Sequence, residues 1–205
     1  MIGRKIISYI DTPTEVITLA EAKAHLDSIR TDQDSAIEMY LSAAIAWASN
    51  VVSFSIRRAT VDYYFDSNIP FSTETKTRNG LRIPANVISI TSVAYHVDDH
   101  TYTTMSTDDY YFENQIPIPT LTIVNVPDIA DHGASYRVRV VEGYYSQSGS
   151  PTHEHDNLPD DVKVAILLKL RDLYDFRGNE TIGQTSELTR TAEHYLFPYS
   201  KLQIL

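Results

Sequence analysis

The sequence predicts an α+β fold: a small helical bundle, made of two long helices plus short N- and C-terminal helices, with an inserted, mainly antiparallel β part. Apolar residues recur every three or four positions in the first quarter of the chain and again after residue 158, which is the spacing of amphipathic helices. Between these regions the period changes to two and β-branched residues become frequent, as in short strands. We expect a single domain over 1–205, helical at 15–57 and 158–178, with a β insertion at 58–145 and a C-terminal segment at 179–205.

Composition limits the classes of protein to consider. A chain of 205 residues with 42% apolar content can bury one sizeable core or two small ones. The absence of cysteine excludes a disulfide framework, a thiolate zinc site and a cysteine nucleophile. The N-terminus lacks an apolar run of signal-peptide length, and the longest apolar stretch, 36–56, is too polar to cross a bilayer. We expect synthesis in the cytosol and no membrane partner.

The charge of the chain is unevenly distributed. Seventeen cationic and 27 acidic side chains give a formal charge of −10. No Lys or Arg occurs between Arg82 and Arg137, and the acidic residues of that segment are Asp98, Asp99, Asp108, Asp109, Glu113, Asp128 and Asp131. Proteins that grip DNA need clustered cations to displace phosphate counterions, so sequence-specific DNA binding is not expected. The segment is either a solvated face or a surface that lies near DNA without holding it.

Two helices are predicted in the N-terminal quarter. Thr18 and Glu21 form a capping box, followed by apolar residues at helical spacing, which predicts a short helix over 18–27. A second helix begins at Asp34 and carries an apolar stripe every three or four residues up to about residue 55, a length of about 30 Å. Tyr40 and Trp47 widen this stripe, and we expect them to contribute to a core.

Six strands are predicted in the central region. The two strongest are 59–65 and 87–97, since both are rich in β-branched or aromatic residues. Weaker strands are expected at 102–105, 110–112, 121–124 and 136–141. Prolines punctuate this region, so we expect its strands to be short or to lie at sheet edges.

A third helix is predicted from Leu158, with Pro159 at a first-turn position and Asp160 and Asp161 near the positive end of the helix dipole. Gly178 should end it. A last short helix over 187–196 should stop at Pro198. We expect the two long helices, although far apart in the sequence, to pack on each other.

Candidate chemistry is sparse. The usual phosphate-binding, acyl-transfer and zinc-protease motifs do not occur, and we expect no cofactor. His153, Glu154, His155 and Asp156 are four potential metal ligands in a row, but adjacent side chains on a loop point in different directions. The group His96, Asp98, Asp99 and His100 falls where a hairpin turn is expected. Asp108-Asp109 and Asp160-Asp161 fit a turn and a helix start better than an acid/base pair. A small metal-dependent hydrolase or ligand-binding domain using His153 and His155 remains open as the alternative function.

Segments in order along nearly the whole chain resemble the gp6-like head-tail connector proteins of tailed phages and prophages. The residues that carry the resemblance are Ile17–Lys23 with Leu26; Leu81–Pro84 running into Val87–Tyr95; Tyr110; Val126-Pro127; Val138–Tyr144; Leu158–Leu168; Leu173, Tyr174 and Arg177; and Leu196–Tyr199. The sequence departs from the family at Asp98-Asp99-His100, where an Asp-Gly turn is expected, at Val126, where the family has Trp, and in a longer loop at 145–156.

The resemblance implies a non-enzymatic subunit of a ring, with dodecamer as the expected stoichiometry. The ring would dock on the portal protein, extend the DNA channel and meet other neck or tail-completion proteins. Such a subunit would reside at the head-tail junction of the virion, after assembly in the host cytoplasm. Another neck or tail-completion protein is a third option.

The resemblance also implies functional residues. The C-terminal segment is the expected portal contact, with candidates Tyr195, Leu196, Phe197, Tyr199, Leu202, Ile204 and Leu205. These residues are more apolar than a solvated tail requires, although the segment could instead pack back on its own bundle. We also expect Asp98, Asp99, Asp108 and Asp109 to face the channel, so that DNA slides rather than adheres.

Overall fold

The computed structural model describes most of the chain. The described residues are 3–66, 81–83, 86–97, 101–113, 120–125, 135–145, 157–176 and 185–200. The chain divides into two units, each made of two separated segments. The sheet unit consists of Met1–Tyr9 and Ala59–Glu142, and the helical unit of Ile10–Arg58 and Gly143–Leu205. The interpretation of the whole chain as a single domain stays a prediction.

The described residues of the helical unit form five helices, confirming the helical part of the predicted α+β class. They are α1 (Pro13–Val16), α2 (Leu19–His25), α3 (Asp34–Val52), α4 (Asp160–Asp175) and α5 (Thr185–Ser200). α2 begins with the predicted capping box: the Thr18 side chain accepts a hydrogen bond from the Glu21 amide, and Glu21 accepts one from the Thr18 amide. None of the helices in the described part of the chain is long and apolar enough to cross a membrane.

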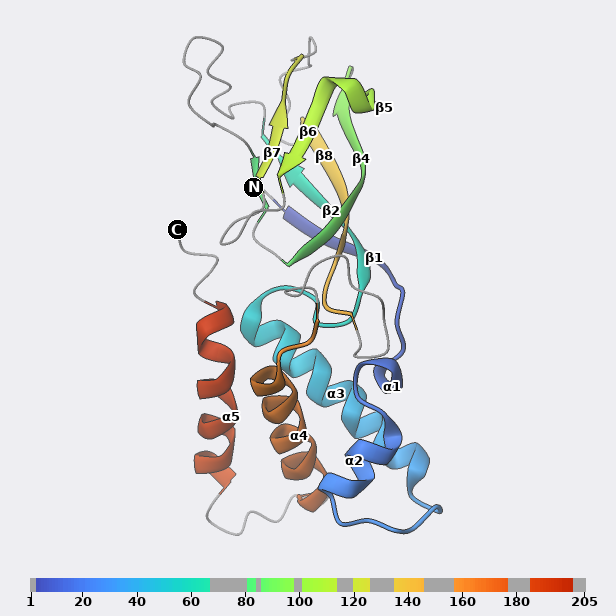
Figure 1. Cartoon of the computed structure of the whole chain (residues 1–205), viewed down its shortest axis with the longest axis vertical. Helices are drawn as coiled ribbons and strands as arrows, with labels where there is room; N and C mark the ends of the chain where they lie inside the picture. The colour runs from blue at the N-terminus through green and yellow to red at the C-terminus, as the bar shows by residue number, and fades with distance from the viewer. Residues whose placement is uncertain are drawn as a thin grey trace. The chain divides into compact units, whose positions relative to one another are not determined.

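The core of the helical unit forms where α3 packs against α4, as predicted, with α5 lying along both helices (Figure 1). α3 buries one stripe at helical spacing, consisting of Ile37, Leu41, Ala44, Ile45, Ala48 and Val52. α4 buries Val162, Ala165, Ile166 and Leu170. α5 adds Ala192 and Leu196, both almost fully buried. Helices more than a hundred residues apart in sequence therefore share one apolar core.

Two predicted helix boundaries are wrong. Pro159 precedes α4 as its N-cap, with ψ at 144°, so the first turn begins one residue later at Asp160. α5 continues through Pro198 to Ser200 instead of stopping at the proline. A proline removes one helix hydrogen bond, but the buried Leu196 and the Tyr199 hydroxyl, which donates to Asp161, hold this last turn against α4.

The sheet unit contains the six predicted strands together with two that were not predicted, β1 and β3. The strands are β1 (Gly3–Tyr9), β2 (Ala59–Phe65), β3 (Leu81–Arg82), β4 (Val87–His96), β5 (Tyr102–Thr104), β6 (Tyr110–Glu113), β7 (Thr120–Ile123) and β8 (Tyr136–Glu142). Five form an antiparallel sheet in the order β1-β2-β8-β4-β5, and three form a second sheet in the order β3-β7-β6. β1 escaped prediction because its pairing partner, β2, lies more than fifty residues away.

The two faces of the five-stranded sheet differ in chemistry. Val61 and Tyr63 of β2 and Val138 and Val140 of β8 point into a buried apolar cluster, to which the second sheet contributes residues of β7. The alternate residues of the same strands are mostly polar, with Thr60, Asp62 and Tyr64 on β2 and Arg137 and Arg139 on β8; Val141 is the exception. The mainly antiparallel β part is therefore confirmed, with one face buried as a core.

Gly143 occupies a position that only glycine fits. Its φ is +121°, and a Cβ atom added there would lie 2.5 Å from the carbonyl oxygen of Arg57. Glycine adopts such a conformation without steric cost, whereas an L side chain is strained. The close approach lets the chain between β8 and α4 run beside 56–58, where the Tyr144 amide donates to the Ile56 carbonyl at 3.0 Å.

We expect Gly143→Ala to lower the free energy of unfolding by about 3 kcal/mol, because backbone strain and a clash with backbone atoms add. Gly3→Ala is the matched control. The nearest atom to a Cβ at Gly3 is 3.9 Å away, so this change should alter stability by less than about 1 kcal/mol. Urea unfolding followed by circular dichroism measures both. Equal effects of the two substitutions would contradict this assignment.

Candidate functional site

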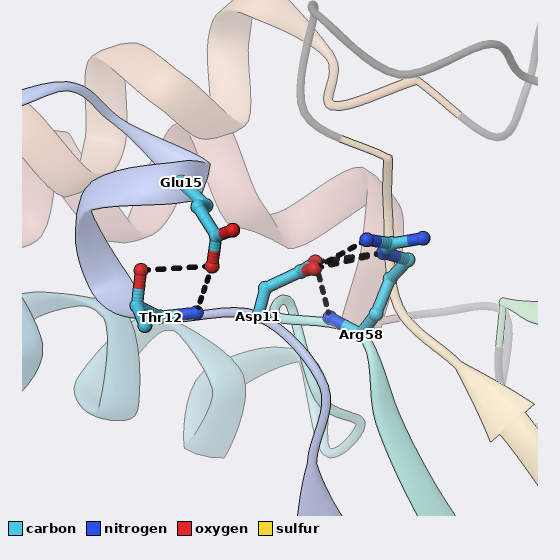
Figure 2. A network of polar contacts seen from close by, with 4 residues as sticks. All are labelled: Asp11, Thr12, Glu15 and Arg58. Atoms are coloured by element: carbon cyan, nitrogen blue, oxygen red, sulfur yellow. Dashed lines mark hydrogen bonds and ion pairs between the residues drawn. The ribbon is translucent and has the colours of Figure 1, made fainter.

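An ion pair between Asp11 and Arg58 lies where the chain leaves the helical unit (Figure 2). The Asp11 carboxylate is 5% exposed and accepts from Nε of Arg58 at 2.9 Å, from Nη2 at 2.5 Å and from the Arg58 backbone amide at 3.3 Å. The hydrogen bonds with Asp11 raise the pKa of Arg58. The Arg58 guanidinium therefore stays charged at any physiological pH, and the pair acts as a structural link.

The Asp11-Arg58 pair is part of a larger set of contacts between three segments of the chain. We call residues 10–11, 56–58 and 143–145 the junction. The Ile10 amide donates to the Arg58 carbonyl at 2.8 Å, and the Tyr144 amide donates to the Ile56 carbonyl at 3.0 Å. The Arg58 guanidinium also lies 4.8 Å from the centre of the Tyr145 ring. Three passages of the chain are thus tied together within the helical unit.

The start of α1 is fixed directly beside the junction. Glu15 accepts from the Thr12 backbone amide at 2.6 Å and from the Thr12 hydroxyl at 2.8 Å, as Figure 2 shows. These bonds, the amide first, lower the pKa of Glu15. The cap turns the chain into α1 immediately after Asp11.

The sheet unit contains its own buried charges. Glu142 is fully buried and accepts from the Arg4 guanidinium and from the Tyr63 hydroxyl. Burial, and then the negative charge of Glu142, raise the pKa of Tyr63. On the opposite face, Asp62 accepts two parallel hydrogen bonds from Arg139 at 2.7 and 2.9 Å. Asp62 is matched by an arginine on the adjacent strand β8, and Glu142 by Arg4 of β1, two strands away across β2; both are structural pairs.

The hairpin predicted around His96 is present. His96 ends β4 and is paired with Tyr102 of β5, with the two ring centres 3.8 Å apart. The Arg137 guanidinium lies 4.6 Å from the centre of the Tyr102 ring. His96 is therefore part of a stacked cluster on the sheet, while Asp98, Asp99 and His100 lie outside the described residues.

The predicted acidic residues fall in two local structures. Asp108 and Asp109 lie in the short 3-10 helix η1 (Thr107–Asp109). Asp109 holds the neighbouring turn: its carboxylate accepts from the Asn125 side chain and its carbonyl from the Val124 amide, both at 2.7 Å. Asp108 is exposed. In the helical unit, Asp160 and Asp161 occupy the first turn of α4, as predicted.

The described C-terminal candidates lie on different faces of α5, so some are exposed and others are buried. Tyr195 and Phe197 are 41% and 53% exposed, whereas Leu196 is fully buried in the helical core. The Tyr199 hydroxyl donates to Asp161 at 2.7 Å, which anchors the end of the helix. Leu202, Ile204 and Leu205 lie outside the described residues. Tyr195 and Phe197 are thus the candidates that the helix presents to solvent.

The described residues offer ion pairs and apolar surfaces rather than a reaction centre. Among them, no three His, Asp or Glu side chains lie close enough together to hold a metal ion. The loop with His153 and His155 lies outside the described residues. Sequence reasoning missed Asp11, Arg58, Arg4 and Glu142, because their partners lie 47 and 138 residues away and leave no local pattern.

Taken together, the fold is a helical bundle with an inserted antiparallel sheet part, and it is shared with chains of solved phage-like particles. Comparison of the sequence with protein-family models and with curated proteins gave no match.

Three of the matching structures are described here. A chain in the neck of an empty gene transfer agent (GTA) particle, computed with C6 symmetry, matches with a TM-score of 0.64 and 17% identity, over 93% of this chain and 94% of that one. A chain in the virion of a native GTA particle gives 0.64 and 15%, over 92% and 93%. A chain in the neck of a native GTA particle, computed with C12 symmetry, gives 0.62 and 18%, over 93% and 94%. The similarity covers nearly the whole length of both chains and establishes a common fold.

We expect Asp11→Asn to destabilise the protein by about 2 kcal/mol, because it removes the buried carboxylate that pairs with Arg58, whose side chain is 30% exposed. Asp32→Asn is the matched control, since Asp32 pairs with Arg30 but both side chains are more than half exposed. Because solvent screens an exposed pair, its loss should leave the unfolding midpoint nearly unchanged. Chemical unfolding of the two variants, compared with wild type, gives the difference. Equal unfolding midpoints for the two variants would mean that the Asp11-Arg58 pair contributes no more stability than the exposed Asp32-Arg30 pair.

Alkaline pH should unfold the protein through its buried tyrosines. Burial raises the pKa of Tyr63, Tyr144 and Tyr199 above the ordinary value of about 10. The folded state therefore favours the neutral phenols. This stabilisation is complete below the unfolded pKa and is lost as the pH rises through it towards the folded pKa.

Tyr63 and Tyr144, which are buried, should each lower the free energy of unfolding by about 1.4 kcal/mol per pH unit above pH 10, whereas the partly exposed Tyr199 should contribute less. Tyr144→Phe should reduce the slope by that amount. Urea unfolding at a series of pH values measures the slope, and absorbance at 295 nm follows phenolate formation. Full ionisation of all tyrosines in a still folded protein would contradict the prediction.

Proposed function

We propose that this chain is a structural, non-enzymatic subunit of the neck, at the head-tail junction of a tailed-phage or phage-like particle. The observation that carries the proposal is the shared fold over nearly the full length of this chain and of chains from GTA particles, two of them in neck structures. The described residues are consistent with it, because their charged groups form structural ion pairs within each unit. In this proposal the protein is assembled in the host cytoplasm, and its place is the virion. The runner-up, a metal-dependent hydrolase using His153 and His155, has no supporting observation among the described residues.

The neck role implies a ring of copies of this chain. The solved necks were computed with C6 and C12 symmetry, which supports a ring, with twelve as the proposed number. Heterologous contacts repeated around an axis close into such a ring and require complementary faces. We propose that the ring docks on the portal protein, extends the DNA channel and carries further neck or tail-completion proteins, as in the gp6-like connectors that the sequence resembles.

Specific surfaces follow from this role. Tyr195 and Phe197 on α5, continued by Leu202, Ile204 and Leu205, are the proposed portal contact, since exposed aromatic side chains supply most of the binding energy in protein interfaces. Leu196 and Tyr199 position this helix from within the helical unit. Asp98, Asp99, Asp108 and Asp109 are the proposed acidic lining that lets DNA pass without adhering.

The proposal is tested by removing the gene for this chain from its phage or prophage. We expect DNA-filled heads without attached tails, visible by electron microscopy, and restored tailed particles when the gene is supplied on a plasmid. Antibody-gold labelling should mark the head-tail junction of the restored particles. Normal numbers of infectious tailed particles in the deletion strain would contradict a neck role.

The proposed portal contact can be tested with purified components. The double substitution Tyr195→Ala and Phe197→Ala should weaken binding to the portal by at least about tenfold, because it removes two aromatic anchors. Ile29→Ala is the control, since Ile29 is 95% exposed on a loop outside α5. Size-exclusion chromatography with light scattering, with and without portal, measures the complex. Unchanged binding by the double variant would place the portal contact elsewhere.

A further inference from the structure

The five-stranded sheet has two open edges of different chemistry. β1 is the strand at one edge and β5 the strand at the other. In the part of the chain that the structure describes, no further strand pairs with the outer side of β1. An unpaired edge strand invites association with another chain unless it is covered or charged. These edges are therefore the natural places on the sheet unit for a contact with a partner.

The β1 edge carries an unpaired cation and an exposed apolar residue. Lys5 is exposed, and its cross-strand neighbour is Asp62. The Asp62 side chain is 2% exposed and pairs with Arg139, and among the described residues no ion pair joins it to Lys5. Ile7, two residues further along the same strand, is 42% exposed. We call Lys5 and Ile7 the β1 patch.

The complementary pair lies on η1 (Thr107–Asp109) and at the end of β7. β5 leads through residues 105–106 into η1, where Asp108 is exposed while Asp109 is engaged with Asn125. The Val124 amide donates to the Asp109 carbonyl at 2.7 Å, which holds Val124 beside η1 with its side chain 58% exposed. We call Asp108 and Val124 the η1 patch.

We propose that the β1 patch of one copy binds the η1 patch of the next copy, with Lys5 facing Asp108 and Ile7 packing on Val124. Asp108 then belongs to the subunit contact, and the proposed acidic lining of the channel is left to Asp98, Asp99 and Asp109. The inference rests on the ring proposed above and assigns its subunit contact to the sheet unit. The two patches are different surfaces, one on β1 and one on η1 with the residue after β7, so a contact between them is heterologous and can repeat around an axis. The occupant is a second copy because each patch offers the charge that the other lacks.

DNA is a less suitable binding partner for the β1 patch than a second copy of the chain. Phosphate binding needs several clustered cations, and the two arginines nearest in the ladder are already engaged: Arg4 with Glu142 and Arg139 with Asp62. Lys5 alone gives one contact. An acidic side chain of a neighbouring copy matches a single exposed lysine better than a polyanion does.

Charge exchange between the patches tests the contact on the full chain in the presence of portal. Lys5→Glu alone, and Asp108→Lys alone, should raise the subunit concentration needed for half-assembly by about tenfold, because like charges then face each other. The double variant should return to within about threefold of wild type, because the pair is restored in the opposite sense. Light scattering measures assembly. Glu38→Lys, an exposed change on α3, is the charge control and should assemble as wild type does.

Cross-linking gives an independent readout, because the natural chain has no cysteine. With Lys5→Cys and Asp108→Cys in one chain, a short bismaleimide should produce a ladder of covalent oligomers up to the closed ring. Ser89→Cys with Asp108→Cys is the control, since Ser89 is exposed on β4, within the sheet, and should give no ladder.

The outcomes separate the two proposals. A ring that forms without the Lys5-Asp108 ladder, and that ignores the charge reversals, overturns the assigned contact and leaves the neck role standing. Wild-type protein that forms no ring with portal overturns the ring itself. If Lys5→Glu lowers DNA affinity and the double variant fails to rescue assembly, Lys5 contacts phosphate and the subunit contact is wrong.

Discussion

The contact between Asp11 and Arg58 is the constraint on which the arrangement of the helical unit depends. The chain passes between the two units three times, after Tyr9, after Arg58 and after Glu142. On the helical side, all three passages enter the junction, where Arg58 binds Asp11 and Gly143 allows close approach of two backbones. A unit built from two segments that are far apart in sequence needs such a link, because its own helices do not fix where the inserted sheet begins and ends. The junction supplies this link through hydrogen bonds between the three passages of the chain.

Buried charges contribute specificity in both units. Replacing a buried ion pair by apolar residues often costs little stability, but breaking one partner of it is expensive. In the sheet unit, a slip of β1 by one residue along β2 would turn Arg4 to the other face and leave Glu142 without its cation. The pair thus selects one register for an edge strand that is otherwise only weakly specified. The same logic applies to Asp11, whose carboxylate is almost fully buried and is matched by three N–H groups of Arg58.

Local patterns in the sequence predicted most of the fold. Periodicity located α3, α4 and six strands, and the Thr18 capping box located α2. The pairing of β1 with β2 and the junction depend on residues far apart in sequence, so no window of the sequence could predict them. The candidate portal residues were predicted as a group, but helix phase separates the buried Leu196 from the exposed Tyr195 and Phe197. The four-residue spacing of the small and apolar residues Ala192 and Leu196 could have shown this division from the sequence.

The contacts of the junction should form and break together as one cooperative element, and amide hydrogen exchange on the full chain tests this most directly. The amides of Ile10 and Tyr144 donate to backbone carbonyls of Arg58 and Ile56. Both amides should exchange as slowly as the amides in the core of α3, although they lie outside helices and strands. In Asp11→Asn, protection at these two amides should fall while the α3 core stays protected. Exchange of Ile10 and Tyr144 in the wild-type protein at the rate of an exposed loop would contradict the account.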